Sequence, residues 1–304
     1  MSGKVVIITG SSGIGLASLQ HLCRMGAKVY MTTPDEDRTR EALKRVEREG
    51  REPGLGEVIW HELDLSDPRS AKTSAERFLT KETRLDILIN NAALITDLGR
   101  PQLNADGLQD NMAINYLGPY VFTRTLLPLL EATATNGSDV RIVNVGSDGH
   151  KSVSYVDYCS KEAWSYKFRW SLLPALERYK YSKLAVHLWT NDLAKRLTAV
   201  KSGITLLIVH PGAIISDGAI RSLNTLTFPR FWIFIMGLMM HPQTMGAYTS
   251  VFAACSPKDN PHVFHGAYIC PPNVSVPQGP NALNELKQRE LAEFTERLLR
   301  EIGI

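Results

Sequence analysis

The stretch Lys4–Gly15, KVVIITGSSGIG, decides how this 304-residue chain folds. Its first six residues are rich in β-branched side chains and predict a buried strand. A glycine-rich turn follows directly and leads into apolar positions at helical spacing. In a strand–turn–helix unit of this kind, backbone amides can approach a pyrophosphate, whose charge also suits the helix N-terminus. We therefore expect the turn to bind phosphate through Gly10, Ser12, Gly13, Ile14 and Gly15.

The same alternation of strand and helix continues along the chain. We expect further strands at Lys28–Thr33, Val58–Leu63, Leu85–Ile89, Arg141–Val145, Ile204–Val209 and near Ala267–Ile269, and helices at Asp37–Glu49, Ser70–Lys81, 105–135 (as a pair), from Tyr179 onward, and Leu283–Leu299. Strands separated by helices predict an α/β fold with a doubly wound parallel sheet. With no linker or composition break, residues 1–304 are expected to form a single domain.

Candidate ligand-binding residues follow several of these strands. Asp64, Asn90–Asn91, Ser147 and Pro211–Gly212 each come after a predicted strand end. Because parallel strands bind ligands at their carboxyl ends, we expect these groups to line one crevice. A structural alternative stays open, since the polar side chains could simply cap their loops.

A tyrosine and a lysine four residues apart open the helix expected from Tyr179 onward. Tyr179 and Lys183 would lie on one helix face. A nearby positive charge favours the phenolate, which would bring the pKa of Tyr179 toward the neutral range where general acid–base catalysis is efficient. The pair is therefore a candidate proton-transfer site, although such pairs also occur by chance.

Composition limits the partners. The chain has 34 basic and 31 acidic residues and a formal net charge of +3, with no basic run interleaved with aromatic residues, so we expect no nucleic-acid partner. The four cysteines are far apart, and His262 and His265 have no ligand partner beside them, so we expect neither metal nor disulfide. The longest apolar stretch, Phe231–Met240, is too short to span a membrane. We expect a cytoplasmic protein without a signal or transit peptide and without a transmembrane segment.

Taken together, the motifs resemble the short-chain dehydrogenase/reductase family, specifically its retinol-dehydrogenase-like and WW-domain-oxidoreductase-like branch. The resemblance rests on TGSSGIG, LDLSD, LDILINNAA, INYLGPY, RIVNVGSDGH, YKYSK, HPGAIIS and GAYICPP. It implies a Rossmann fold and an NAD(P)-dependent oxidoreductase. In this family Tyr179 would be the general acid–base, Lys183 would hold the nicotinamide ribose, Ser147 would orient the substrate oxygen and Asn115 would anchor a proton-relay water. The cofactor-binding residues it implies are the five of the glycine turn together with Asp64, Leu65, Asn90, Asn91, Ala92, Tyr179, Lys183, Pro211, Gly212, Ile214 and Ser216.

The chain departs from the family pattern at several places, including the glycine turn, the end of the second strand and position 146. Only Ser11 and Ser12 separate the first two glycines of the turn, where the family usually has three residues. Thr32–Pro34 ends the second strand without the carboxylate that accepts the ribose hydroxyls of NAD, which favours NADP over NAD. Gly146 stands where the branch commonly has a second serine.

An apolar, methionine-rich segment at about 214–245 is expected to form a lid over the substrate. The predicted reaction is hydride transfer between NADP(H) and a carbonyl or alcohol of an apolar small molecule, such as a retinoid, a steroid or a secondary metabolite. Two alternatives stay open: a dinucleotide-binding scaffold or sensor without redox turnover, and a non-redox cyclase or dehydratase on the same fold. Relatives often pair through the helices that carry Asn115 and Tyr179, so a homo-oligomer is also compatible. We interpret Tyr158 and Lys161 as surface residues of an inserted loop.

Overall fold

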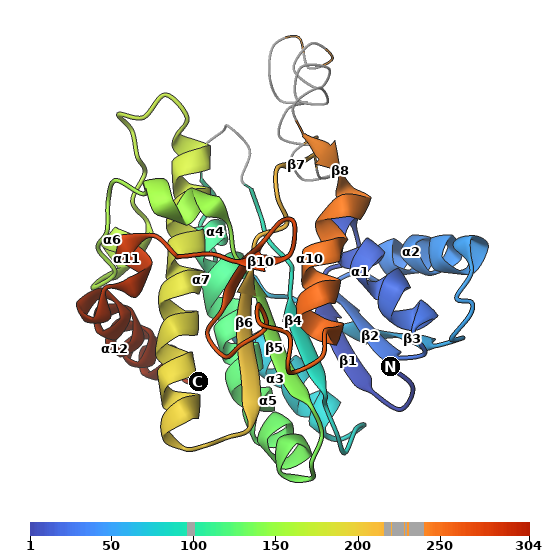
Figure 1. The fold of residues 1–304 in the computed structure, drawn as a ribbon. Coiled ribbons are helices and arrows are strands. Elements are labelled where there is room, and N and C mark those ends of the chain that lie inside the picture. Colours follow the sequence, from blue (N-terminus) through green and yellow to red (C-terminus); the bar gives the residue numbers. More distant parts are fainter. Residues whose placement is uncertain (96–100, 216–219, 221–227, 229, 231–239) are drawn as a thin grey trace.

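The computed structural model describes residues 1–95, 101–215, 220, 228, 230 and 240–304. They build an eight-stranded sheet in the order β10-β9-β6-β5-β4-β1-β2-β3, in which all neighbours are parallel except β9 and β10. The strands are β1 Val5–Thr9, β2 Lys28–Thr33, β3 Glu57–Glu62, β4 Ile87–Asn90, β5 Val140–Val145, β6 Ile204–Val209, β9 Tyr268–Cys270 and β10 Val274–Ser275. The predicted doubly wound α/β sheet in a single domain is confirmed (Figure 1).

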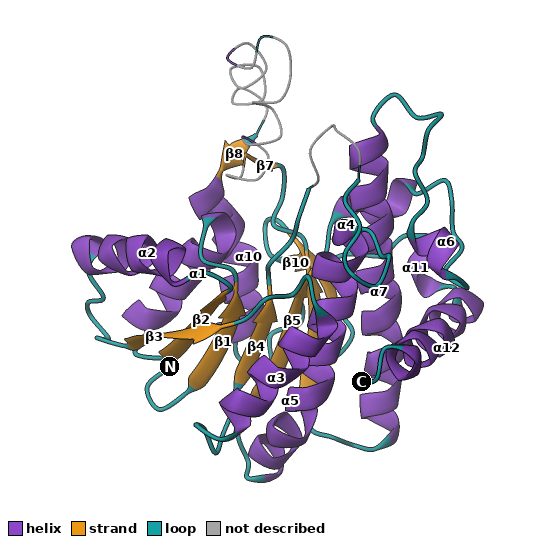
Figure 2. Cartoon of the chain, turned by 180° about the vertical axis from the view of Figure 1, so that it is seen from behind, coloured by secondary structure: helices purple, strands orange, loops and turns teal. Residues whose placement is uncertain are grey.

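Helices cover both faces of the sheet because successive side chains of a strand point in opposite directions. In β1, Val5 and Ile7 enter one core, whereas Val6 and Ile8 enter the other. Figure 1 shows α10 in front of the sheet, and the opposite view in Figure 2 shows α3 and α5. The helices are α1 Gly13–Arg24, α2 Glu36–Glu49, α3 Pro68–Leu79, α4 Asp110–Met112, α5 Gly118–Thr135, α6 Lys161–Trp164, α7 Pro174–Ala199, α10 Gln243–Cys255, α11 Pro280–Leu283 and α12 Glu285–Glu301.

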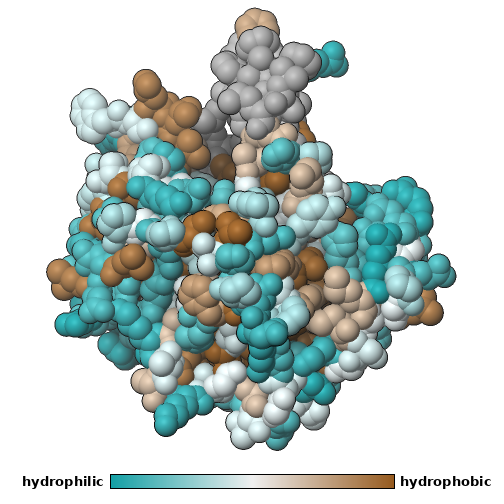
Figure 3. Space-filling model, in the orientation of Figure 1, coloured by the Kyte–Doolittle hydropathy of each residue, from teal (hydrophilic) through white to brown (hydrophobic). Residues whose placement is uncertain are grey.

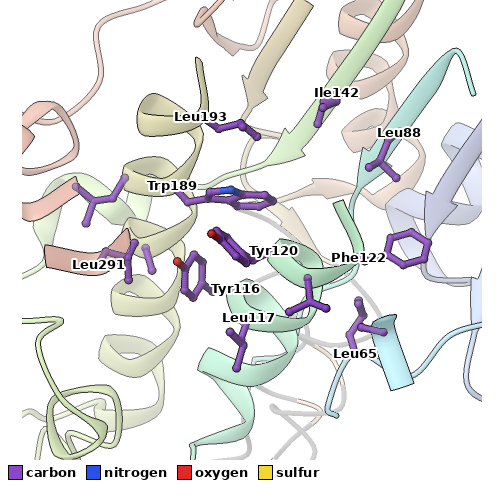
Figure 4. Close-up of a cluster of buried hydrophobic side chains, with 14 of the residues drawn as sticks. Leu65, Leu88, Tyr116, Leu117, Tyr120, Phe122, Ile142, Trp189, Leu193 and Leu291 are labelled. Atoms are coloured by element: carbon purple, nitrogen blue, oxygen red, sulfur yellow. The ribbon is translucent and has the colours of Figure 1, made fainter. Parts of the chain in front are cut away.

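The larger core contains a group of aromatic side chains between α5 and α7. Tyr116, Tyr120 and Trp189 lie face to edge or tilted against one another, with ring centroids 5.7–6.1 Å apart (Figure 4). The C-terminal helix α12 closes this core from outside, since Tyr116 shares a hydrogen bond of 2.7 Å with Thr295. The Tyr120 hydroxyl also donates to Glu296 over 2.6 Å. α12 therefore covers part of the α5–α7 face.

Two expectations about local structure need correction. The predicted helix pair over 105–135 is a short helix, α4, followed by a π-helix at Ala113–Leu117 and then by α5. Tyr158, expected at the surface, is fully buried and donates a hydrogen bond of 2.8 Å to the carbonyl of Tyr181. An inserted loop can therefore bury its aromatic residues, a fact that local spacing does not reveal.

Most of the predicted lid lies outside the described residues. At its ends, β7 (Ile214–Ile215) pairs in parallel with β8 (His241–Pro242). Both strands project beyond the carboxyl ends of the main sheet (Figure 1). Among the residues that the structure describes, no helix combines the length and apolarity needed to cross a membrane.

Candidate active site

Two adjoining hollows open at the carboxyl ends of the central strands. They share Gly10, Ser12 and Ala92 and so form one continuous cleft. The first hollow is further lined by Gly13, Ile14, Asn91, Ala93, Ile95, Val145, Gly146, Tyr179, Lys183 and Pro211. The second is further lined by Ser11, Thr32, Thr33, Pro34, Leu63, Asp64, Leu65 and Ile114. The predicted crevice exists, and it has the two-part form that a dinucleotide needs.

The glycine turn forms the floor between the two hollows. Gly10 has φ +94°, a conformation that favours glycine, and its N–H donates to the carbonyl of Thr32 over 3.0 Å. A Cβ on Gly15 would lie 2.6 Å from Nδ2 of Asn91, so only glycine lets these two segments approach. α1 begins at Gly13 without a side-chain cap from Ser12, which leaves its first N–H groups directed at the cleft. The turn thus forms in spite of its missing residue.

Tyr179 lies on the second turn of α7 and faces the first hollow. Its phenol is hydrogen-bonded to the Ser147 side chain. Ser147 follows β5, and its Oγ also accepts the N–H of Gly149 over 3.1 Å, which fixes the hydroxyl at the start of a 3₁₀ turn, Asp148–Ser152. Two predicted catalytic residues, which are 32 positions apart in the sequence, are therefore in direct contact.

Lys183 lies one helical turn further along α7 and is almost completely buried. Its Nζ donates to the carbonyl of Val145 over 2.6 Å and lies 5.8 Å from the centroid of the Tyr179 ring. Burial lowers the pKa of this ammonium to about 8. An ammonium has three N–H donors, so the remaining ones can serve a ligand in the hollow.

The pKa of Tyr179 does not shift toward the neutral range as expected. Burial raises the pKa of the Tyr179 phenol to about 12, and the hydrogen bond with Ser147 offsets this increase only in part. Desolvation disfavours the charged phenolate more strongly than nearby polar groups stabilise it. The Tyr179 phenol is therefore neutral at pH 7.

Asn115 lies behind the cleft, in the π-helix. Its side-chain amide is held on both sides, because Oδ1 accepts the N–H of Leu94 over 2.6 Å and Nδ2 donates to the Leu94 carbonyl and to Ser182 Oγ over 3.0 and 2.9 Å. These bonds tie the loop after β4 to α7. The side chain that was predicted to anchor a relay water is thus engaged with protein groups.

The predicted cofactor residues after β4 have different surroundings. Asn90 is buried away from the cleft and donates to Thr123 and Asn144 over 3.0 and 2.8 Å. Asn91 lines the first hollow, and its Nδ2 donates to the carbonyl of Thr9 over 2.9 Å. Within the pair, Asn90 therefore joins the strands, while Asn91 contacts the glycine turn.

Some of the other predicted cofactor residues line one of the two hollows, and others do not. Asp64 and Leu65 line the second hollow, although Oδ1 of Asp64 accepts two bonds from Ser66, at 2.8 and 2.7 Å. Pro211 lines the first hollow, whereas Gly212 and Ile214 lie beyond its lining. Ser216 falls outside the described residues.

Two stacked histidine rings hold the loop that contains Ser147 in place. The rings of His150 and His187 are buried and 3.7 Å apart. His150 Nε2 accepts the N–H of Gly279 over 2.9 Å, so its Nδ1 carries the proton and donates to the carbonyl of Ser147 over 2.6 Å. A Cβ on Gly146 would lie 2.5 Å from His187 Nε2. The glycine that departs from the family pattern therefore makes room for this ring.

No group of three or more potential metal ligands occurs in the part of the chain that the structure describes. His265 bonds to backbone groups of β6 and α7, with its Nδ1 3.0 Å from the Ile204 carbonyl and its Nε2 2.9 Å from the Ala194 carbonyl. His262 Nδ1 lies 3.2 Å from Ser275 Oγ. Both rings thus have structural contacts.

Comparison with known families agrees with this geometry. The family model described as short chain dehydrogenase matches residues 4–164, a range that includes the glycine turn, both asparagines after β4, Asn115 and Ser147. The chain belongs to the short-chain dehydrogenase/reductase family. It is accordingly an NAD(P)-dependent oxidoreductase, and its cofactor is a nicotinamide dinucleotide.

Individual relatives place this short-chain dehydrogenase in the retinol-dehydrogenase-like branch. It is 41% identical to a short-chain dehydrogenase/reductase of Armillaria gallica, over 99% of this chain and 94% of that protein. It is 34% identical to human retinol dehydrogenase 14, over 85% of this chain and 76% of that protein. The crystal structure of an uncharacterised protein from Mycobacterium paratuberculosis is similar with a TM-score of 0.72 and 25% identity, over 98% of this chain and 94% of that one.

Several cleft residues of this dehydrogenase were not among the predicted site residues. They come from the ends of strands and from the loops beside them: Ser11, Leu63, Ile95, Ile114 and Val145. Their position next to a strand end is a usable signal. Ile114 is the exception, since it belongs to the π-helix, whose irregular turn does not follow from local spacing.

Proposed function

We propose that this short-chain dehydrogenase transfers hydride between NADP(H) and a carbonyl or alcohol of an apolar small molecule, with Tyr179 as its acid–base group. The observation that carries the proposal is the hydrogen bond between Tyr179 and Ser147 beside the buried Lys183, in the hollow that adjoins the glycine turn. The Tyr179 phenol, the Ser147 hydroxyl and the Lys183 ammonium therefore lie together where the nicotinamide half of a dinucleotide would bind.

The residues present fit such a cofactor. The uncapped N-terminus of α1 and the glycine turn suit a pyrophosphate. Lys183 has N–H donors beyond its bond to Val145, and a ribose offers hydroxyl acceptors. The second hollow, between Thr32–Pro34 and Asp64–Leu65, would take the adenosine. When bound, the nicotinamide supplies or accepts the hydride.

In the direction of reduction, Tyr179 gives its phenolic proton to the carbonyl oxygen of the substrate. Ser147 donates a hydrogen bond to the same oxygen and holds it within reach of the phenol. The pKa of about 12 keeps Tyr179 protonated at neutral pH, which suits an acid that donates a proton. Proton transfer of this kind contributes roughly 10²–10⁴-fold to a rate.

The preference for NADP is argued from the end of β2. Thr32, Thr33 and Pro34 line the second hollow, and none of them carries a charge that would repel a 2′-phosphate. The next acidic residue, Asp35, uses its carboxylate to cap α2 by accepting the N–H of Asp37 over 2.8 Å. We expect a higher kcat/KM with NADPH than with NADH, and a clear preference for NADH would contradict this part of the proposal.

The substrate class follows from the lining near the catalytic pair. Ile14, Ile95 and Val145 make this wall of the hollow apolar. One relative is a retinol dehydrogenase by name, and retinol is an apolar alcohol. Retinoids, steroids and apolar secondary metabolites all fit, and the predicted lid at 214–245 would cover them.

The decisive experiment is a screen of apolar carbonyls and alcohols with both cofactors, following NADPH absorbance. Tyr179→Phe should reduce turnover by at least about 10²-fold while cofactor affinity stays within twofold. Tyr166→Phe, which changes a tyrosine outside the cleft, is the matched control and should retain activity. Parent-like activity in Tyr179→Phe would remove this residue from the mechanism.

The same screen separates the alternatives. Cofactor binding by calorimetry without turnover on any substrate would indicate a scaffold or sensor. Product formation without a change in NADPH absorbance would indicate a cyclase or dehydratase that uses Tyr179 as a plain acid.

A further inference from the structure

The loop that leads into α7 exposes large apolar side chains. Trp170 is 96% exposed and Leu172 is 99% exposed, while the neighbouring Leu173 is 51% exposed. In Figure 1 this loop is the yellow-green segment that rises above the start of α7, and Figure 3 shows apolar atoms gathered at that corner. Scattered exposed apolar residues are ordinary, but adjacent ones of this size mark an interaction site.

The base of the loop is fixed by packing and hydrogen bonds, so the structure holds the tip of the loop in its exposed position. Phe168 is buried, and the Tyr166 ring stacks on Tyr155 with centroids 4.1 Å apart. Gln109 Nε2 donates to the carbonyl of Ser165 over 2.6 Å. Phe168 has a positive φ of 49°, and the N–H of Ser171 donates to its carbonyl over 3.0 Å. This turn directs residues 169–172 away from the core.

The positive charges next to the tip of the loop indicate which kind of partner it binds. Lys167 and Arg169 are both exposed, and the sequence has no acidic residue between Glu162 and Glu177. Tryptophan and leucine flanked by lysine and arginine suit the boundary of an anionic lipid bilayer, where the rings and aliphatic chains enter the headgroup region and the cations meet phosphate.

We propose that the loop 165–173 binds this protein to the surface of an anionic membrane through Trp170 and Leu172, with Lys167 and Arg169 contacting lipid headgroups. The loop immediately precedes α7, whose second turn carries Tyr179, so the membrane would lie on the side of the molecule where the cleft opens. The contact is peripheral. It does not depend on the proposed reaction and can be measured without cofactor or substrate.

The test is sedimentation of the full chain with vesicles of phosphatidylcholine and phosphatidylglycerol at a ratio of about 7:3. We expect binding to these vesicles and at least about tenfold weaker binding to pure phosphatidylcholine. Trp170→Ala with Leu172→Ala should lower the partition coefficient at least about tenfold. Lys167→Gln with Arg169→Gln should lower it at least about fivefold on the anionic vesicles.

Matched controls change equivalent residues elsewhere. Leu55→Ala with Leu286→Ala replaces leucines that are 67% and 59% exposed, and Lys44→Gln with Arg48→Gln removes two exposed charges from α2. Both control pairs should bind like the parent.

A spectroscopic measurement places the contact at the tryptophan. Vesicles with brominated acyl chains should quench parent fluorescence, and Trp170→Phe should lose most of this quenching. Vesicle binding that is absent, or equal in the loop variants and the parent, would overturn the proposal. Self-association that depends on Trp170 in the absence of lipid would do so as well, because the loop would then bind a second copy of the chain.

Discussion

At the scale of single residues, the bulk of the His187 ring requires a glycine at position 146. A Cβ at position 146 would meet His187 Nε2 at 2.5 Å and Ile208 Cγ2 at 2.8 Å, and both neighbours are buried. Because packed interiors tolerate added volume poorly, Gly146→Ala should lower the free energy of unfolding by about 1–3 kcal/mol. Urea denaturation measures this change.

A double-mutant cycle tests the cause. His187→Val shortens the side chain that blocks position 146, so Gly146→Ala should cost about 1 kcal/mol less when it is combined with His187→Val than when it is made alone. The contact with Ile208 remains, and relief should be partial. Strict additivity of the two substitutions would show that the ring does not limit position 146.

At the scale of elements, the π-helix 113–117 aims Asn115 at the loop after β4. Asn115→Ala would leave the Leu94 N–H and carbonyl without their side-chain partner, in a partly buried loop beside the cleft. We expect a loss of about 1–3 kcal/mol in stability together with lower activity. Thermal unfolding and initial rates measure the two effects, and a stable but inactive variant would instead favour a purely catalytic role.

The position of the C-terminal helix α12 leads to a prediction about the oligomeric state. It covers part of the α5–α7 face through Thr295, Glu296 and Phe294, which contact Tyr116, Tyr120 and Trp164. Pairing through this face would require α12 to leave its apolar contacts. We therefore expect a monomer of 33.8 kDa in light scattering at micromolar concentration. A stable dimer under these conditions would contradict the prediction.

At the scale of the whole molecule, buried histidines make stability depend on pH. Burial lowers the pKa of His61, His150, His187 and His210 below the ordinary value. In the unfolded chain these groups titrate near ~6.5, so the unfolded state binds more protons as the pH falls below that value. The free energy of unfolding should therefore be highest above about pH 6.5 and should fall below it, by up to about 1.4 kcal/mol per pH unit for each histidine.

Urea unfolding between pH 8 and pH 5 checks the direction of this effect. His187→Val should flatten the profile, because one buried titrating group is lost. Stability that stays constant from pH 7 to pH 5 would be inconsistent with neutral buried rings.

Much of the fold followed from local sequence. Runs such as KVVIIT and ITLLIV are apolar on both faces because both faces of the sheet are covered, and that pattern identifies buried parallel strands. The glycine turn and the four-residue spacing of Tyr179 and Lys183 are likewise local properties, since backbone sterics and helix periodicity determine them. These features sufficed for the fold class and for the cleft, whose lining includes Tyr179 and Lys183.

Other features depended on contacts between residues distant in sequence. The raised pKa of Tyr179 reflects burial, which spacing to Lys183 does not reveal. Tyr158 packs on Tyr181, 23 residues away, and Asn115 bonds to Leu94, 21 residues away. The sequence by itself therefore determined the sheet, the glycine turn and the placement of Tyr179 and Lys183 on one helix face. Only the tertiary structure decided the protonation state of Tyr179 and the hydrogen-bond partners of Tyr158 and Asn115. The reason is that desolvation and packing depend on every neighbour that folding brings into contact.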